Sequence, residues 1–433
     1  MNFDTVKKMQ EENQSITQNY GFANNSFDFG IALLDSHIKD VLKTCEASYS
    51  QVALASLTTF GFVLAHAGMK KTSLYFLDLS NSGTGKSHNM TLQVNLLLNG
   101  IIKIQEKSQQ AYDNESELKR FNNIHRGKIT VPALNQCIKS VSSQFVIIDE
   151  LGMLMARNDE IIDEITKLYG VETTSLSVTK SEAPSSQYIL PVQFSFIGAT
   201  TLTYLGGSKA LHKHLGGGFI NRAFLAYNTI LKSPQEITSI YKDNLDYDKS
   251  NQVALKIYYF AKNFKSKLIF TKASEDELLS FKREIQTIRI KYNEIGSELG
   301  SFYTRIEQNT HIVINILHLL KCYEKGSLDD EIGVEITTLA INFIKNIVFV
   351  ELDKLINYLN DGELLEREEK QKAKIVQFVE TYRIKHNKMP KIRDVAMKTR
   401  LSKSQILELI KDYLEIVPCE TTLRYCQNIS KGF

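Results

Sequence analysis

The sequence predicts an α/β fold with a parallel sheet, followed by an all-helical region and a small basic C-terminal module. Three observations support this prediction. An apolar stretch, residues 74–79, runs into a loop of small residues that ends in Gly-Lys-Ser at 85–87. A second apolar stretch ends in two carboxylates at 149–150. From residue 233 onward, apolar residues recur every three or four positions, which is the spacing of amphipathic helices.

Residues 74–90, LYFLDLSNSGTGKSHNM, are typical of a strand, a phosphate-binding loop and the start of a helix. Small residues let the backbone curl around phosphate groups, and the first N–H groups of the helix face the bound anion. Lys86 would reach the β- and γ-phosphates of ATP, and the Ser87 hydroxyl would bind Mg²⁺. The residues expected to bind the nucleotide are Ser82, Gly83, Thr84, Gly85, Lys86 and Ser87. The full motif has glycine six positions before the lysine, where this chain has Ser80.

The second apolar stretch, residues 144–150 (QFVIIDE), fits a central parallel strand. Ligands bind at the carboxyl ends of such strands in open α/β sheets. Asp149 would hold Mg²⁺, and Glu150 would polarise the attacking water. A buried strand that ends in a solvated acidic turn explains the same pattern when it stands alone. The Gly-Lys-Ser loop upstream favours the nucleotide site, and hence a P-loop NTPase core.

Residues 175–190 predict two short strands joined by the turn SEAPSS, with Lys180 near the bend. A further strand, residues 192–198, ends in Ala-Thr-Thr at 199–201. In ring-forming P-loop ATPases a polar residue at this place senses the γ-phosphate, and Thr200 or Thr201 could serve here. The same two residues could equally cap the short helix that follows them.

Arg222 follows three consecutive glycines, residues 216–218, and precedes an apolar strand. An arginine behind a flexible loop near the end of a nucleotide-binding domain is a candidate for stabilising the transition state in a neighbouring subunit. A surface salt bridge is the competing explanation.

The C-terminal part of the chain is strongly basic. Residues 370–433 hold 14 Lys or Arg and 6 Asp or Glu, a net charge of +8, whereas the first 369 residues carry −5. Three helical segments with short breaks indicate a helix-turn-helix with a possible wing at 416–429, facing a nucleic acid. Ser402 is well placed to cap the third helical segment. A basic helical bundle that binds a protein is the alternative. The residues expected to contact DNA are Lys391, Arg393, Lys398, Arg400, Lys403, Gln405 and Lys411.

The chain of 433 residues is long enough for several domains. We expect a mobile arm (1–26), an ATPase core (27–232), a helical domain (233–365) and the basic module (366–433). No apolar run approaches the roughly 20 residues that cross a bilayer. The five cysteines lack metal-site spacing, which favours a reduced, cytoplasmic compartment.

In this order, the motifs resemble an uncharacterised family of P-loop ATPases of phages, plasmids and other mobile elements, often joined to primase or helicase modules. The resemblance covers roughly residues 45–325 and implies a RecA-like or AAA-like core. It implies nucleotide and magnesium chemistry at the matching positions Lys86, Ser87, Asp149, Glu150 and Arg222. The hairpin at 175–190 also resembles the pore hairpin of superfamily III viral helicases, whose basic tip grips single-stranded DNA, and Lys180 is the candidate for that contact.

The sequence therefore predicts a DNA-dependent ATPase that uses ATP and Mg²⁺, most simply a ring-forming helicase or translocase for the replication of a mobile element. Its expected partners are further copies of the chain, single-stranded DNA in a pore, duplex DNA at the C-terminal module, and a primase or other replication protein. No membrane association is expected. Two alternatives stay open: a helicase loader or initiator without unwinding activity, and a non-catalytic DNA-binding protein regulated by nucleotide.

Overall fold

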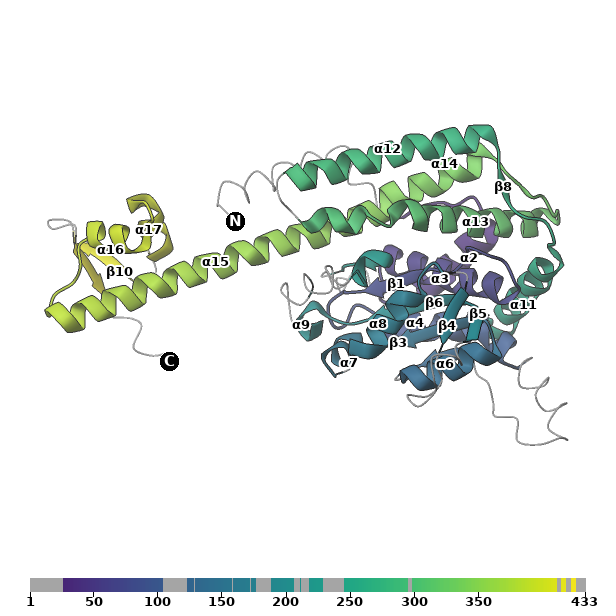
Figure 1. Cartoon of the computed structure of the whole chain (residues 1–433), viewed down its shortest axis with the longest axis horizontal. Helices are drawn as coiled ribbons and strands as arrows, with labels where there is room; N and C mark the ends of the chain where they lie inside the picture. Colours follow the sequence, from purple (N-terminus) through teal and green to yellow (C-terminus); the bar gives the residue numbers. More distant parts are fainter. Residues whose placement is uncertain are drawn as a thin grey trace. The chain divides into compact units, whose positions relative to one another are not determined.

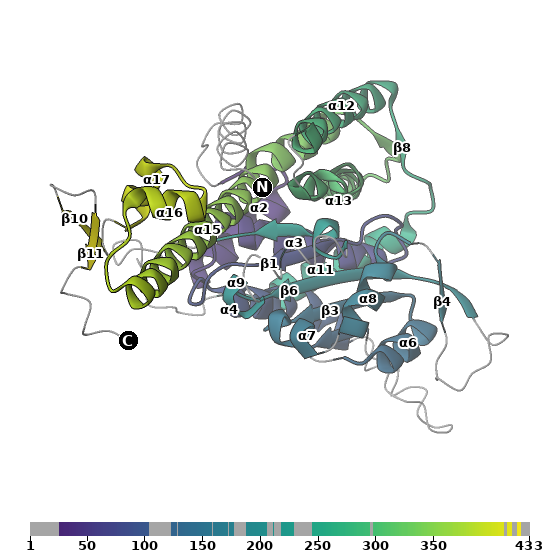
Figure 2. The ribbon, with the colours of Figure 1, turned by 60° about the vertical axis from the view of Figure 1, so that its left-hand side comes forward.

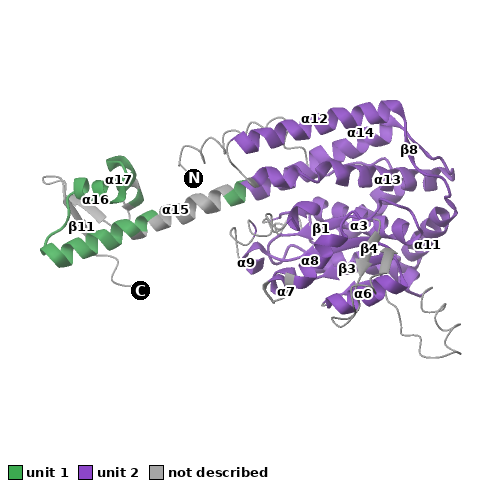
Figure 3. Cartoon of the chain, in the orientation of Figure 1, with its two compact units in different colours: residues 1–10, 357–433 green, residues 11–356 purple. Residues whose placement is uncertain are grey.

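The structure is a computed structural model that describes residues 26–103, 123–127, 129–157, 159–171, 173–176, 188–205, 211, 218–228, 245–294, 298–410, 414–417 and 422–425. Its described residues fall into two compact units, one ending at Ile356 and one beginning at Asn357 (Figure 3). Lys180, Lys411 and nearly all of the expected N-terminal arm lie outside the described residues. The four-domain division stays a prediction, and its boundary at 365/366 falls inside helix α15 (Phe349–His386).

The larger unit is built around a five-stranded parallel sheet. In sheet order the strands are β2 (Ile124–Arg126), β3 (Ser143–Ile148), β6 (Gln193–Ala199), β1 (Tyr75–Asp78) and β7 (Phe224–Ala226). The three central strands are buried along almost their whole length, which explains why their sequences are apolar runs without alternation. The predicted parallel α/β sheet is thus confirmed.

Helices cover both faces of this sheet (Figures 1 and 2). Helix α3 (Tyr49–His66) packs across β1, β3, β6 and β7 and is buried from Ser50 to Ala65. Its first turn is fixed by a capping box between Ser48 and Gln51. Packed against α3 are α2 (Ala32–Thr44), α4 (Lys86–Gln93), which continues into the π-helix Val94–Leu98, and α11 (Tyr247–Asn263). The other face carries α6 (Val131–Ser140), α7 (Leu151–Arg157) and α8 (Asp159–Leu168).

The helical region that follows the sheet confirms the three- and four-residue apolar spacing. It contains α12 (Lys272–Glu294), α13 (Ile306–Lys325), α14 (Val334–Phe343) and the start of α15, with short strands β8 (Ile269–Phe270) and β9 (Glu331–Ile332) beside them. Helix α13 packs against both α3 and the bundle of α12 and α14. Among the described helices, none is long and apolar enough to cross a membrane.

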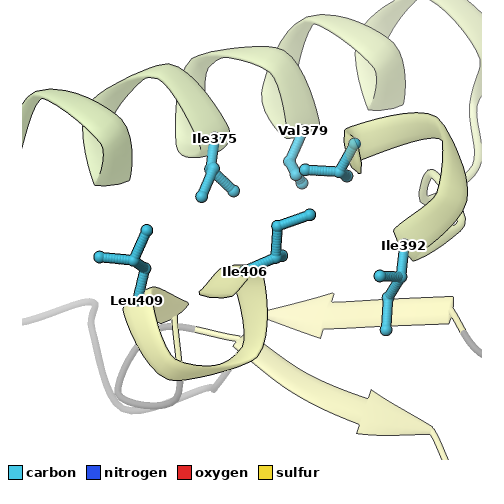
Figure 4. Close-up of a cluster of buried hydrophobic side chains, with 6 residues drawn as sticks. Ile375, Val379, Ile392, Ile406 and Leu409 are labelled. Atoms are coloured by element: carbon cyan, nitrogen blue, oxygen red, sulfur yellow. The ribbon is translucent and has the colours of Figure 1, made fainter. Parts of the chain in front are cut away.

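The smaller unit contains the end of α15, α16 (Ile392–Thr399), α17 (Lys403–Ile410) and an antiparallel pair, β10 (Leu414–Val417) with β11 (Thr422–Tyr425). Apolar side chains of the three helices form its core (Figure 4). They are Ile375, Val379, Ile392, Val395, Ile406 and Leu409. Three helices followed by a two-stranded ribbon are compatible with the predicted helix-turn-helix and wing, whose assignment stays a prediction.

Candidate functional site

The strand register brings three of the predicted motifs to one edge of the sheet. Asp78, the last residue of β1, pairs with Ala199 at the end of β6. Ile148, the last residue of β3, pairs with Gly198, so Asp149 comes level with the end of β6. The Thr200 amide donates a hydrogen bond of 2.9 Å to the Asp78 carbonyl. The phosphate loop, the acidic pair and the Thr-Thr sequence therefore share the carboxyl edge, although more than 100 residues separate the first from the last.

Glycine is required in the loop at two positions. Gly83 and Gly85 have φ angles of +81° and +76°, a conformation that other residues adopt only with strain. A Cβ atom on Gly85 would also lie 2.5 Å from the Ala47 amide nitrogen. Helix α4 begins directly afterwards, at Lys86. The sequence thus forms a tight turn that leads into a helix N-terminus, the geometry that phosphate binding needs.

The loop residues differ in exposure. The side chains of Ser82 and Ser87 are exposed, whereas Thr84 is buried and its Oγ1 donates a hydrogen bond of 2.8 Å to the Asn81 carbonyl. Ser82 and Ser87 therefore present hydroxyls to solvent at the loop, while the Thr84 side chain stabilises the loop from inside.

Lys86 is folded back onto the loop. Its Nζ donates hydrogen bonds of 2.6 Å to the carbonyls of Ser80 and Asn81. Burial lowers the pKa of Lys86, and the carboxylates of Asp78 and Asp149 oppose that shift. Asp149 is thus close enough to Lys86 to influence its pKa, so the acidic strand end and the loop lysine lie near each other.

Asp78 is a residue of this site that sequence reasoning missed. Its carboxylate is buried, accepts a hydrogen bond of 2.7 Å from Gln51 Nε2, and accepts one of 3.1 Å from the Ser80 amide. Burial raises the pKa of Asp78 to about 6, although these donors and Lys86 act in the opposite direction. An acidic residue inside an apolar strand was the signal that could have revealed it.

Ser80 stands where the full motif has glycine, and hydrogen bonds tie Ser80 and its neighbour Asn81 to one distant residue, Asn228. The Ser80 Oγ accepts a hydrogen bond of 2.9 Å from the Asn228 amide, and the next amide, of Asn81, donates one of 2.9 Å to the Asn228 carbonyl. Asn228 lies just beyond β7. The preceding residue, Tyr227, donates its amide to the buried carboxylate of Glu351 in α15, at 2.7 Å. The loop is thus anchored to the end of the sheet's edge strand.

A buried polar chain extends from the loop into the helical layer. The Gln51 carbonyl accepts from Asn89 Nδ2 (3.0 Å), and Asn89 Oδ1 accepts from Gln93 Nε2 (3.2 Å). Gln93 Nε2 also donates to Ser56, so its Oε1 is the acceptor for His37 Nε2, at 3.0 Å. Burial lowers the pKa of His37 to about 4, so its imidazole is neutral at pH 7. Each of the side-chain donors named in this series of hydrogen bonds has an acceptor. These hydrogen bonds fix the first two turns of α4 on α3.

Asp149 and Glu150 are both exposed at the start of α7. Glu150 has a φ angle of +56°, and its amide donates a hydrogen bond of 3.0 Å to Asp149 Oδ1. This backbone conformation is costly for a residue other than glycine and turns the chain sharply after the strand. Asp149 and Ser87 supply the oxygen ligands that Mg²⁺ prefers, at a solvent-accessible edge, so the residues present fit this ion.

The two threonines after β6 have different roles. Thr201 Oγ1 accepts a hydrogen bond of 3.2 Å from the Tyr204 amide and thereby caps α9 (Leu202–Leu205). Thr200 is buried against α7, since a Cβ on Gly152 would lie 2.7 Å from its Oγ1. Capping thus explains Thr201, whereas Thr200 is the threonine held beside β1.

Arg222 lies at the opposite, amino edge of the sheet. β7 begins two residues later, and its Phe224 pairs with Phe76. Four residues of strand, roughly 13 Å, therefore separate the level of Arg222 from the phosphate loop. The Arg222 guanidinium donates to the Gly218 carbonyl, and its own carbonyl accepts from Asn309 Nδ2 at 3.3 Å. Arg222 is thus not part of the site formed by its own chain.

In the smaller unit, the residues expected to contact DNA are exposed, and no ion pair engages them within the described part of the chain. They are Lys391, Arg393, Lys398, Arg400, Lys403 and Gln405. Gln405 also caps α17: its Oε1 accepts from the Ser402 amide (2.9 Å), and its amide donates to Ser402 Oγ (3.3 Å). The predicted cap at Ser402 is confirmed, and the DNA contacts stay predictions.

Comparison with known proteins gives no assignment by sequence: no family model and no curated protein matches the chain. Among solved structures, it is similar to an MCM homolog from Methanopyrus kandleri (TM-score 0.39, 8% identity), covering 74% of this chain but only 62% of that one. It is also similar to a protein from Cytophaga hutchinsonii that is proposed to be an ATPase (TM-score 0.31, 11% identity, 79% and 89% coverage). Because both TM-scores are below 0.5, the assignment of the site depends on its own geometry.

Proposed function

We propose that this chain is a DNA-dependent ATPase, a helicase or translocase that works as a homo-oligomeric ring. The observation that carries the proposal is the position of Lys86. Its ammonium is held in a glycine-bearing loop before a helix N-terminus, under the electrostatic influence of Asp149 from a second strand of the same sheet edge. A loop with a lysine and a separate acidic strand end is the arrangement that binds Mg·ATP.

In this mechanism, Lys86 leaves the carbonyls of Ser80 and Asn81 and binds the β- and γ-phosphates, while the exposed loop amides hold the remaining oxygens. Ser87 and Asp149 would hold Mg²⁺, which neutralises charge that develops on the phosphates. Glu150 orients and polarises the attacking water. The Thr200 hydroxyl, which donates to the Thr201 carbonyl at 3.3 Å, would turn to contact the γ-phosphate.

Arg222 belongs to this mechanism only as a contribution to another subunit, because it lies at the amino edge of its own sheet. Burial lowers the pKa of Arg222, and the neighbouring Arg305 lowers it further, so this cationic surface favours an anion as its partner. A neighbouring nucleotide would supply that anion. The active unit is therefore a ring in which each site lies between two copies of the chain.

DNA is the proposed substrate because of the basic module and the predicted hairpin. The exposed basic residues of α16 and α17 suit a phosphate backbone, and Lys180 is proposed to contact a single strand. We propose a role in the replication of a phage or other mobile element, with a primase or other replication protein as partner. This part of the proposal rests on the resemblance of the motifs.

The proposal is tested by measuring ATP hydrolysis with and without single-stranded DNA, together with strand displacement from a forked duplex. We expect DNA to stimulate hydrolysis and unwinding to require ATP. Stimulation without unwinding would indicate a loader or initiator. ATP binding without hydrolysis would instead indicate a nucleotide-regulated DNA-binding protein.

A further inference from the structure

A cavity of about 520 Å³ lies at the amino edge of the sheet, the edge opposite the phosphate loop. Residues that precede β1, β3 and β6 line it, together with Gly170 and Val171 after α8 and the first turns of α13. Its volume is within the range of ligand sites, roughly 300–1,000 Å³. No residue of the nucleotide site contributes to it, so it is a separate site.

The polar lining of this cavity is basic. Lys70 and Lys71 line it, and none of its described lining residues is acidic. His311 also lines it; burial lowers the pKa of His311, so its imidazole can donate a hydrogen bond without adding a positive charge. Glu307, which lies one turn before His311 on α13, is already paired with Lys282 at 2.9 Å. Such a lining favours an anionic ligand.

The backbone that carries these lysines is held in place. The Lys71 carbonyl accepts a hydrogen bond of 3.1 Å from Asn315 Nδ2 of α13, and its φ angle is +55°. Thr72 packs so closely on α3 that a Cβ on Gly61 would overlap its carbonyl oxygen. Both lysines are exposed, so a fixed loop presents two cationic groups at the cavity.

The remaining lining contains neutral polar residues and, beside the hairpin, an apolar part that is open to solvent. Val171 is 37% exposed and Pro191 is also exposed, although both belong to the cavity lining. They flank the base of the hairpin formed by β4 (Thr173–Leu176) and β5 (Tyr188–Pro191). Apolar surface beside cationic groups suits a nucleotide, because a base offers a flat π-face and its phosphates offer charge.

The cationic surface also continues beyond the cavity along α13. Gln308, which lines the cavity, accepts a hydrogen bond of 3.2 Å from Arg305 Nη1. A ligand with several phosphates in a row fits this continuation better than a single free nucleotide does.

We propose that this cavity binds one nucleotide unit of single-stranded DNA, with flanking phosphates on Lys70, Lys71 and His311 and the base against Val171 and Pro191. The inference rests on the proposed function and deepens it, since it adds a DNA contact at the base of the hairpin, within the described residues. It gives the larger unit a DNA site that does not depend on the basic C-terminal module.

The test measures binding of a fluorescent oligo-dT to the full-length chain across a salt series. Lys71→Glu is expected to weaken binding roughly tenfold, and loss of one phosphate contact lowers the salt slope by about 0.7. The matched control is Lys249→Glu, an exposed lysine of the same unit that lines a different cavity, and it should leave both values unchanged. ATP hydrolysis without DNA should stay at the wild-type rate in both variants and reports intact folding.

Val171→Asp tests the base contact. It should weaken binding of oligo-dT more than binding of an abasic strand of the same length. Equal binding by Lys71→Glu and wild type, while DNA still stimulates hydrolysis, would overturn the cavity site and leave the proposed function standing. Equal affinity for dTMP and the oligonucleotide would also overturn it, in favour of a mononucleotide site. Absence of any single-strand binding by the wild-type chain would contradict both proposals.

Discussion

Gln51 Nε2 donates a hydrogen bond of 2.7 Å to the carboxylate of Asp78, and both side chains are buried. The same carboxylate binds the amide of Ser80 in the phosphate loop. A helix on one face of the sheet thus positions the end of β1 and, through it, the first residue of the loop. The Gln51 side chain is aligned for this by the Ser48 amide, which donates to its Oε1 at 2.7 Å.

Gln51→Ala should destabilise the chain and weaken nucleotide binding. Removal of the amide leaves a buried carboxylate with one donor fewer, which typically costs about 1–3 kcal/mol of unfolding free energy. The pKa of Asp78 should rise further, because a hydrogen bond to its charged form is lost. Urea unfolding and titration with a fluorescent ATP analogue measure the two effects. Gln252→Ala, at an exposed glutamine of α11, is the control and should change neither.

Asp78 also makes stability depend on pH. Its pKa is about 6 in the folded protein against 3.8 for the ordinary group, so the folded state binds this proton more tightly. Its contribution to stability therefore falls as pH rises from about 4 to 6 and is constant above that range. Over this pH range, the contribution of Asp78 to the free energy of unfolding changes by up to about 3 kcal/mol. The difference in unfolding free energy between wild type and Asp78→Asn, measured from pH 4 to 7, should show this slope. A flat difference would mean that Asp78 titrates normally.

Ser80→Gly restores the full phosphate-loop motif, yet we expect it to be harmful. The serine hydroxyl accepts a hydrogen bond from the Asn228 amide, and its loss should cost about 0.5–1.5 kcal/mol of stability. The loop would then lose part of its anchor to β7, and ATP affinity should fall several-fold. If Ser80→Gly bound ATP more tightly than wild type, the serine hydroxyl would not contribute to ATP binding.

Lys86→Ala and Glu150→Gln should separate binding from chemistry. Without the ammonium, the β- and γ-phosphates lose their main cationic contact, and nucleotide binding should be abolished. Glu150→Gln keeps the size of the side chain but cannot act as a base, so ATP should bind while hydrolysis falls at least about a hundredfold. The measurements are titration with labelled ATP and release of phosphate. Equal residual hydrolysis in both variants would refute the assigned roles.

Arg222→Ala should bind ATP normally and hydrolyse it at least about a thousandfold more slowly, if the guanidinium acts on a neighbour. Mixing this variant with Lys86→Ala provides a sharper test. Some interfaces of the mixed ring combine an intact loop from one chain with an intact arginine from the other, so hydrolysis should partly return. If the mixture of the two variants stays inactive, Arg222 does not act in catalysis on a neighbouring subunit.

The double substitution Arg393→Ala and Arg400→Ala tests the basic module. Each lost phosphate contact should lower the slope of log affinity against log salt for duplex DNA by about 0.9. Lys265→Ala, an exposed lysine of the larger unit, serves as the matched control. Duplex binding with an unchanged salt slope would favour the alternative, a helical module that binds a protein.

The sequence by itself determined the local parts of this protein. The apolar runs at 74–79 and 144–148 predicted buried parallel strands, glycine and lysine at 85–86 predicted a phosphate loop, and Ser402 predicted a helix cap. Each of these follows from neighbouring residues, because strand burial, turn conformation and helix capping depend on spacing along the chain.

Only the tertiary structure decided which parts meet. It brought Asp149 and Thr200 to the edge that holds Lys86, and it put Arg222 at the opposite edge. It also paired Gln51 with Asp78 and Ser80 with Asn228, across 27 and 148 residues of sequence. Strand order and the partners of buried polar groups depend on long-range packing, which no local pattern encodes.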